Sequence, residues 1–177
     1  MTNISATKMA FVCFVVSCLS WPAAASETLD RVLAVVAGDV ITLTDVMAAR
    51  ELGLQSAGNA LDPVRAILSK LIDRELVLAE VERYAPPEPS ADAVDAEIAV
   101  VRARFPSATA FAETLTRSGI DEKHLRETLR QDLRIRAYED QRFAAAGDRR
   151  QELADEWIAA LRRRGDVVDL YLPTTRN

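Results

Sequence analysis

The sequence predicts a mostly α-helical fold of about six helices with one small β element. Apolar residues recur at spacings of three and four over most of 44–143 and again over 148–165. Only 29–41 and 167–172 have the apolar pattern of strands. Because a lone strand is unstable in water, we expect the N-terminal and C-terminal strands to pair with each other.

The first 25 residues have the layout of a secretory signal peptide. Lys8 supplies a positive charge, an apolar run of twelve residues follows over Met9–Ser20, and Ala23–Ala25 provides small residues for a signal peptidase. A run of twelve is too short to span a bilayer core, which takes about 20 residues. We therefore expect cleavage after Ala25, a periplasmic location and no transmembrane span in the mature protein.

A second way of processing the N-terminus remains open. Val15–Cys18 resembles the motif at which bacterial lipoproteins are modified, and it would anchor the mature chain through Cys18. The other cysteine, Cys13, also precedes Ala25, so a chain that begins at Ser26 contains none. We expect the folded part to need neither disulfides nor a cysteine metal site.

Length and charge limit the classes of function. Residues 26–172 suit one domain with a single core, followed by a tail at 173–177. The formal net charge of −5 becomes −6 without the signal peptide, whose one charged residue is Lys8. A nucleic-acid-binding protein would show a basic stripe instead, so we expect no nucleic-acid partner.

The opening strand lies within 29–41. Val32–Val36 is apolar on both faces, as in a buried strand. Gly38 and Asp39 interrupt the pattern like a tight turn, and Val40 resumes it. The segment therefore predicts a strand with a short hairpin return.

Two helices follow from about residue 44. We expect Thr44 to cap the first and Gly53 to end it. Asp62, with a proline after it, begins the second helix, which runs to Tyr84. That helix is apolar on most sides, so we expect it to be the central helix of the core. Its apolar residues are Val64, Ile67, Leu68, Leu71, Ile72, Leu76, Val77, Leu78 and Val81.

Three more helices are predicted before residue 143. Ser90 begins one that Pro106 ends, a short one ends at Gly119, and Asp121 begins a long one. The apolar positions of the three are Val94, Ile98, Val101 and Phe105; Phe111 and Leu115; and Leu125, Leu129, Leu133 and Phe143. The long helix is expected to start with a staple between Ile120 and Leu125. Its outward side is expected to carry Arg126, Arg130 and Arg134.

A closing helix and strand occupy 148–172. Asp148 and Gln151 are expected to form a capping pair. The buried residues of this helix are expected to be Leu153, Trp157, Ala160 and Leu161. Arg162–Arg164 stands at the negative end of the helix dipole, before Gly165; a membrane or nucleic-acid patch is the alternative interpretation. The strand is expected over Val167–Leu172.

The pattern of polar residues does not indicate an active site. The one histidine, His124, falls near a helix start, and we expect it to face solvent. Glu75 falls on the densest apolar face of its helix, where we expect an ion pair with an arginine of a neighbouring helix rather than catalysis. The sequence has no Gly-rich phosphate loop, GxSxG turn or HExxH motif. We expect no catalytic, cofactor or metal site, and no enzyme.

Six segments in this order resemble the SurA family of periplasmic chaperones. Leu68–Glu80, which reads LSKLIDRELVLAE, is similar to the central helix of that family. In chain order, the segments that carry the resemblance are Asp30–Ile41, Thr44–Val46, Leu68–Glu80, Ser90–Ile98, Ser118–Leu133, and Trp157–Leu161 with Val167–Leu172. The resemblance implies the N-terminal helical chaperone core of that family. Family members usually carry parvulin prolyl isomerase domains before the closing helix, but here only Phe143–Asp148 lies in that gap.

The resemblance implies a holdase that works without ATP on unfolded exported proteins, especially outer-membrane β-barrel precursors. Such clients expose alternating apolar strands, which a cradle of amphipathic helices can cover reversibly. The sequence does not indicate which residues contact the client. Two alternatives remain open: a cell-envelope adaptor that binds one folded partner, and a prolyl isomerase by family membership alone.

Overall fold

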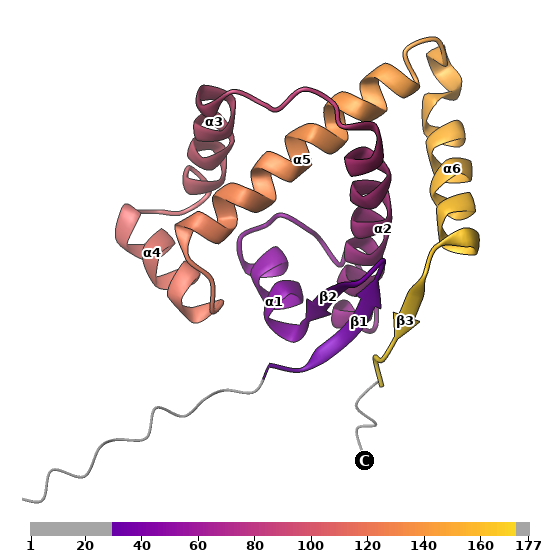
Figure 1. Cartoon of the computed structure of the whole chain (residues 1–177). Helices are drawn as coiled ribbons and strands as arrows, with labels where there is room; N and C mark the ends of the chain where they lie inside the picture. Colours follow the sequence, from indigo (N-terminus) through magenta and orange to yellow (C-terminus); the bar gives the residue numbers. More distant parts are fainter. Residues whose placement is uncertain (1–29, 173–177) are drawn as a thin grey trace, which may run out of the picture.

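The computed structural model describes residues 30–172, which form a mostly helical fold with a small antiparallel sheet (Figure 1). The fold class predicted from the sequence is confirmed. The signal-peptide and tail assignments, including Cys13 and Cys18, lie outside the described residues. The elements are β1 (Val32–Val36), β2 (Asp39–Thr42), α1 (Leu43–Glu51), α2 (Pro63–Tyr84), α3 (Ala91–Arg102), α4 (Ala108–Arg117), α5 (Glu122–Arg142), a 3₁₀ turn (Gly147–Arg149), α6 (Arg150–Arg164) and β3 (Val167–Asp169).

The sheet joins the two ends of the described chain. Its strand order is β2-β1-β3, so β1 lies in the centre. β1 and β2 form a hairpin whose turn is at Ala37 and Gly38, both with positive φ, one residue earlier than predicted. β3 pairs antiparallel with β1, with Val168 opposite Val35. The predicted pairing of the first and last segments is therefore confirmed, although β3 ends at Asp169.

The start of α1 corrects one predicted cap. Thr42, not Thr44, is the N-cap: its hydroxyl accepts the Asp45 N–H at 3.2 Å, and the Asp45 carboxylate accepts the Thr42 N–H at 2.8 Å. This reciprocal pair needs an acidic residue three positions after the cap. Thr44 has Met47 at that position and lies inside the helix.

The predicted caps of three other helices are confirmed. The side chains of Asp62, Ser90 and Asp121 each accept the backbone N–H three residues further on. The capping pair predicted for α6 is wrong, because a 3₁₀ turn leads into this helix and no side chain caps it. α3 ends at Arg102, earlier than predicted, and Phe105 in the following turn packs on Phe111, with ring centroids 5.5 Å apart.

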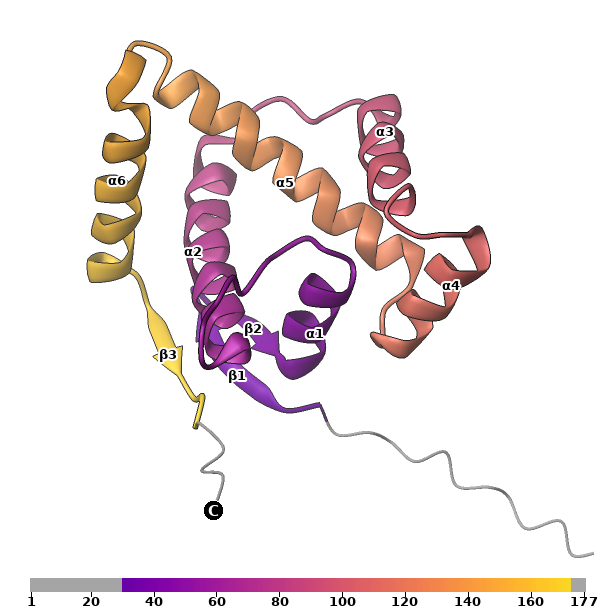
Figure 2. The same cartoon turned by 180° about the vertical axis from the view of Figure 1, so that it is seen from behind.

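The buried residues form two clusters instead of the expected single core. The first joins the sheet, α1, α2, α6 and the end of α5, and the second joins α3, α4, the beginning of α5 and Leu52 at the end of α1. α5 runs from α4 to α6 and contributes to both (Figure 2). Among its buried residues, Leu125 and Leu129 belong to the second cluster, and Tyr138 belongs to the first. Arg134 was predicted to point outward, but it is buried and lies between Leu129 and Tyr138 along the helix. Its Nε lies 3.2 Å from Oε1 of Glu88.

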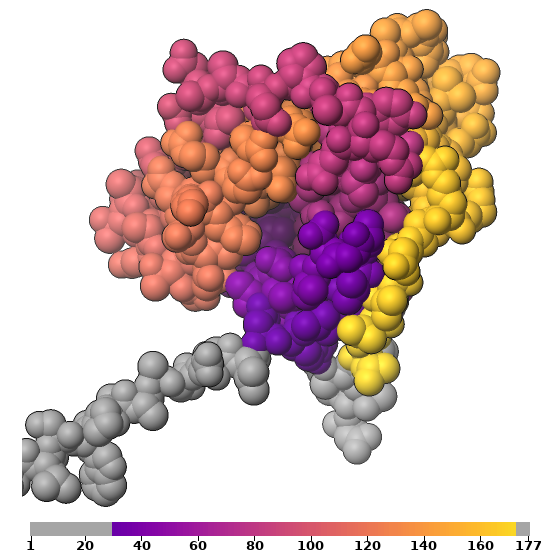
Figure 3. Space-filling view, viewed as in Figure 1, coloured from indigo at the N-terminus to yellow at the C-terminus, as the bar shows by residue number. Residues whose placement is uncertain are grey.

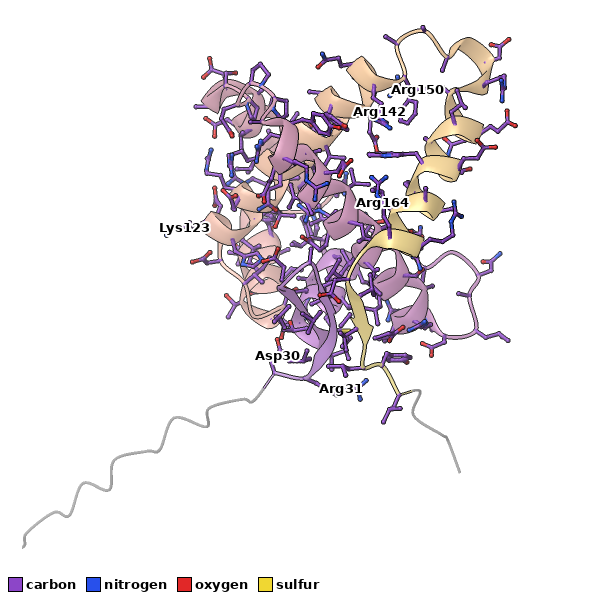
Figure 4. The ribbon with its side chains drawn as sticks, turned by 45° about the vertical axis from the view of Figure 1, so that its right-hand side comes forward. Asp30, Arg31, Lys123, Arg142, Arg150 and Arg164 are labelled. Carbon is purple, nitrogen blue, oxygen red and sulfur yellow. The ribbon has the colours of Figure 1, made fainter. Side chains whose placement is uncertain are left out.

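α6 is held against α2 by apolar and ionic contacts. Trp157 and Leu161 are buried in the first cluster, and the Trp157 ring packs edge-on against Phe143. Two of the predicted end-cap arginines reach α2: Arg162 pairs with Asp73, and Arg164 contacts Glu80 at 3.0 Å. Figure 4 shows Arg164 at the end of α6 next to β3. These pairs fix the closing helix before the chain enters the sheet.

Candidate functional site

Two clefts lie on opposite sides of the contact between α2 and α5. The first, of about 420 Å³, opens between β2, α1, α2 and α5, and we call it the β2 cleft. Figure 3 shows a hollow on the front of the molecule between these elements. The second, of about 410 Å³, lies between α2, α3, α5 and α6, and we call it the α3 cleft. The residues that line both are Leu54, Gln55, Arg74 and Asp132.

Arg74 separates the clefts and ties α2 to α5. Its Nε donates to Asp132 Oδ1 at 2.7 Å, and its Nη2 donates to Gln131 Oε1 at 2.9 Å and to the Thr128 carbonyl at 3.2 Å. The side chain is only 12% exposed. Burial alone would lower the pKa of Arg74, but the charges of Asp132 and Glu75 outweigh it and raise the pKa. Arg74 therefore stays charged in the middle of the molecule.

Glu75 is paired differently from the prediction. Its Oε1 accepts a hydrogen bond from Arg74 Nη1 at 2.6 Å, so the partner comes from its own helix and not from a neighbouring one. The reason is that α5 presents acceptors to α2 at this level: the Thr128 carbonyl, Gln131 and Asp132. Burial raises the pKa of Glu75, and the charge of Arg74 opposes this only in part.

The walls of the β2 cleft mix apolar and acidic side chains. Val40 is 51% exposed, and Leu71 and Ile120 are half-buried. The carboxylates along the cleft are Asp39, Asp45, Glu75, Glu82 and Asp132, and its basic side chains are Arg74 and His124. Polar groups among accessible apolar surface are typical of a binding site. The acidic excess favours segments that carry both apolar and basic side chains.

His124 is exposed, as predicted, and its backbone N–H donates to the Asp121 cap at 2.7 Å. The structure adds that it lies along the β2 cleft. Within residues 30–172, no group of three metal-ligating side chains is gathered, and no helix is long and apolar enough to cross a membrane.

The α3 cleft is more strongly charged. Its basic side chains are Lys70, Arg74, Arg104 and Arg136, and its acidic ones are Asp73, Glu97, Asp132 and Glu139. Arg104 donates to the Gly53 carbonyl at 2.6 Å, and Lys70 donates to the Ser56 carbonyl at 2.7 Å. Lys70 and Arg104 therefore fix the loop after α1 through its backbone carbonyls.

Sequence reasoning named no client-contacting residues, and the reason lies in the geometry. The walls of the β2 cleft come from β2 and α1, which follow one another directly, and from α2 and α5, which lie further along the chain. Val40 is the exposed apolar residue of β2 that lines the cleft, but its exposure depends on what packs beside β2.

Comparison with known proteins found no matching family model and no matching curated protein.

Proposed function

We propose that the protein is a SurA-like periplasmic chaperone core that binds unfolded exported polypeptides without ATP, through the β2 cleft. The observation that carries the proposal is the composition of this cleft, in which the exposed Val40 and the half-buried Leu71 and Ile120 stand among carboxylates. Unfolded chains offer apolar and basic side chains in many orders. A site whose walls combine apolar and acidic side chains can bind many such segments weakly.

The arrangement of the walls supports reversible binding. Leu71 packs against the first cluster, whereas Ile120 packs against the second cluster, and both line the cleft. A segment in the cleft therefore touches both parts of the molecule. Contacts of this kind are individually small, and the cost of ordering a flexible chain keeps the total affinity low. A holdase needs such affinity because it must release its client.

Outer-membrane β-barrel precursors are the proposed clients. Their strands alternate apolar and polar side chains, and they must stay unfolded until they reach the membrane. The predicted signal peptide would place the protein in the same compartment, where ATP is not supplied. Enzymatic activity is not part of the proposal.

The test is suppression of aggregation of an unfolded outer-membrane protein by the purified protein. Val40→Lys puts a charged side chain on the exposed apolar wall of the β2 cleft and is expected to reduce protection severalfold. The matched control is Val100→Lys on α3, because Val100 is 55% exposed and lines neither cleft. It should protect like the wild type, and circular dichroism should show both variants folded.

Client range separates a holdase from an adaptor. A holdase protects several unrelated unfolded polypeptides, whereas an adaptor binds one folded protein and ignores unfolded ones. Failure of the wild-type protein to protect any unfolded client would overturn the proposal. Equal loss of protection in both lysine variants would show that clients bind outside the β2 cleft.

A further inference from the structure

The outer edge of β3 is an uncovered strand edge. β3 is the last strand of the sheet, and no other described element lies on its outer side in either of two opposite views (Figures 1 and 2). Natural proteins protect such edges with lysine, proline or a bulge, because an open edge pairs with other chains. The edge segment Val167–Leu170 reads VVDL and contains neither lysine nor proline.

The register of the sheet decides which backbone groups face outward. The Leu170 N–H donates to the Leu33 carbonyl, and the Ala37 N–H donates to the Asp166 carbonyl, both at 2.9 Å. In an antiparallel pair, hydrogen-bonded positions alternate, so Val168 also bonds to β1. The N–H and C=O groups of Val167 and Asp169 consequently point away from β1, toward the open side.

The side chains on the outer face form an apolar row. Val40, Val35 and Val168 lie opposite one another across the three strands. Val168 and Leu170 are each 48% exposed, although they are large and apolar. The row therefore ends abruptly at the open edge, where a further strand would continue it.

We propose that β3 pairs with β3 of a second copy of this chain, antiparallel, around a two-fold axis at Val168. In this register Val167 exchanges both backbone hydrogen bonds with the partner's Asp169, and the symmetry repeats the exchange. Val168 then faces the partner's Val168, and the valine row runs across six strands. The Asp169 carboxylate is already paired with Arg65 in its own chain, so the two edges meet without unpaired like charges.

The register makes a specific prediction for cross-linking. The predicted mature chain has no cysteine, so a single introduced thiol reports one position. Val168→Cys places two thiols directly opposite each other, at a Cα separation of about 4.5 Å for a non-hydrogen-bonded pair, within the range of a disulfide. Mild oxidation should give severalfold more covalent dimer than Leu170→Cys, whose thiols would lie several residues apart, or Val100→Cys on α3.

The mass in solution supplies a second measurement. In a sedimentation concentration series, the weight-average mass of the wild type should rise toward twice that of the monomer. Val168→Lys places two like charges at the axis and should remain monomeric, whereas Val100→Lys on α3, outside the sheet, should associate like the wild type.

Neither measurement involves an unfolded client, so each can fail while the proposed holdase function holds. A wild type that stays monomeric throughout the series would overturn the pairing. Equal cross-linking of Val168→Cys and Leu170→Cys would overturn the register. Cross-linking that occurs only when an unfolded polypeptide is added would assign the edge to the client and overturn the assignment to a second copy.

Discussion

At Glu75 the free-energy cost of burying the ionised carboxylate exceeds the stabilisation that the ion pair with Arg74 provides. The carboxylate bonds to Arg74, yet its pKa is raised, which means that the folded state binds its proton more tightly than the unfolded state does. An ion pair that is removed from water commonly fails to recover the loss of hydration. Glu75 is therefore expected to lower stability when it is ionised.

The first prediction follows from the sign of this shift. The free energy of unfolding should fall as the pH rises from the usual carboxyl pKa through the raised one, because ionisation is less favourable in the folded state. Glu75→Gln removes the titration and keeps an acceptor for Arg74. We expect this variant to be more stable than the wild type at neutral pH, with a difference that shrinks as the pH falls below the usual carboxyl pKa. Urea denaturation at several pH values measures this difference.

Glu127 provides a control of opposite sign. Its pKa is lowered by hydrogen bonds from Arg130, so its ionised form stabilises the fold, and this contribution is lost as the pH falls. Glu127→Gln should lower stability slightly at neutral pH. If Glu75→Gln also lowers it, the burial cost of Glu75 is smaller than proposed.

A second prediction compares two leucines of α2. Leu68 is fully buried, whereas Leu71, predicted from the sequence as a core residue, is half-buried at the edge of the β2 cleft. Leu68→Ala should cost about 2–5 kcal/mol, the usual range for a buried leucine. Leu71→Ala should cost clearly less, because part of its side chain already meets water. Equal shifts of the denaturation midpoint would contradict the observed burial.

Three of the predicted helix caps are confirmed because the contact that forms each is local in the sequence. The caps at Asp62, Ser90 and Asp121 depend on a hydrogen bond to a residue three positions away, so their sequence signals are complete. The environments of Arg134 and Glu75 depend on which helix packs across them. Periodicity along one helix does not contain that information.

Among the elements, α6 depends on close packing at its end. Gly165 has an ordinary φ of −77°, so its role is not conformational freedom. A Cβ at this position would lie 2.4 Å from the Leu76 side chain and 2.9 Å from the Leu161 carbonyl oxygen. Gly165 therefore allows the end of α6 to approach α2 closely before β3 begins.

The third prediction tests this contact. Gly165→Ala should destabilise the protein by about 1–3 kcal/mol, as expected for overpacking. Because the nearest atom belongs to Leu76, shortening that side chain with Leu76→Ala should relieve part of the clash. The double variant should then lose less stability than the sum of the single variants. Thermal melting followed by circular dichroism gives all four values, and strict additivity would contradict the contact.

Element boundaries were predictable in most places, and the exceptions have a physical cause. The capping pair predicted at Asp148 and Gln151 competes with a 3₁₀ turn that enters α6 directly, and Gln151 bonds instead to Asp155 within the helix. α3 ends at Arg102, and Phe105 after it packs on Phe111. Because the residue before a proline is disfavoured in the helical conformation, the helix ends before Phe105 and Pro106.

For the whole molecule, pairing of the chain ends was predictable and the two clusters were not. Only two segments had strand patterns, so they were the natural partners. The buried face of α5 passes from Leu125 and Leu129 through Arg134 to Tyr138, and the sequence does not show that the residues before and after Arg134 belong to different clusters. The clefts form at this change, which explains why the candidate site was not foreseen.

The fourth prediction concerns truncation after Gly147. The shortened chain loses α6 and β3, which cover part of the first cluster and one side of β1. It also removes Arg162, the partner of Asp73, and Arg164, one of the two arginine partners of Glu80. We expect an aggregating or less stable product that protects clients poorly. Equal melting temperature and equal client protection for the truncated and full-length mature proteins would contradict a shared core.

The passage of α5 through both clusters has a consequence for local opening. The second cluster is the smaller of the two and contains no strand, so α3, α4 and the first half of α5 should open more readily than the rest. Amide hydrogens near Leu125 should therefore exchange with deuterium faster than those near Tyr138, although both lie in one continuous helix. Uniform exchange along α5 would contradict this. The cleft wall at Ile120 and His124 moves with the faster part, so the width of the β2 cleft can change while the sheet and α6 stay intact.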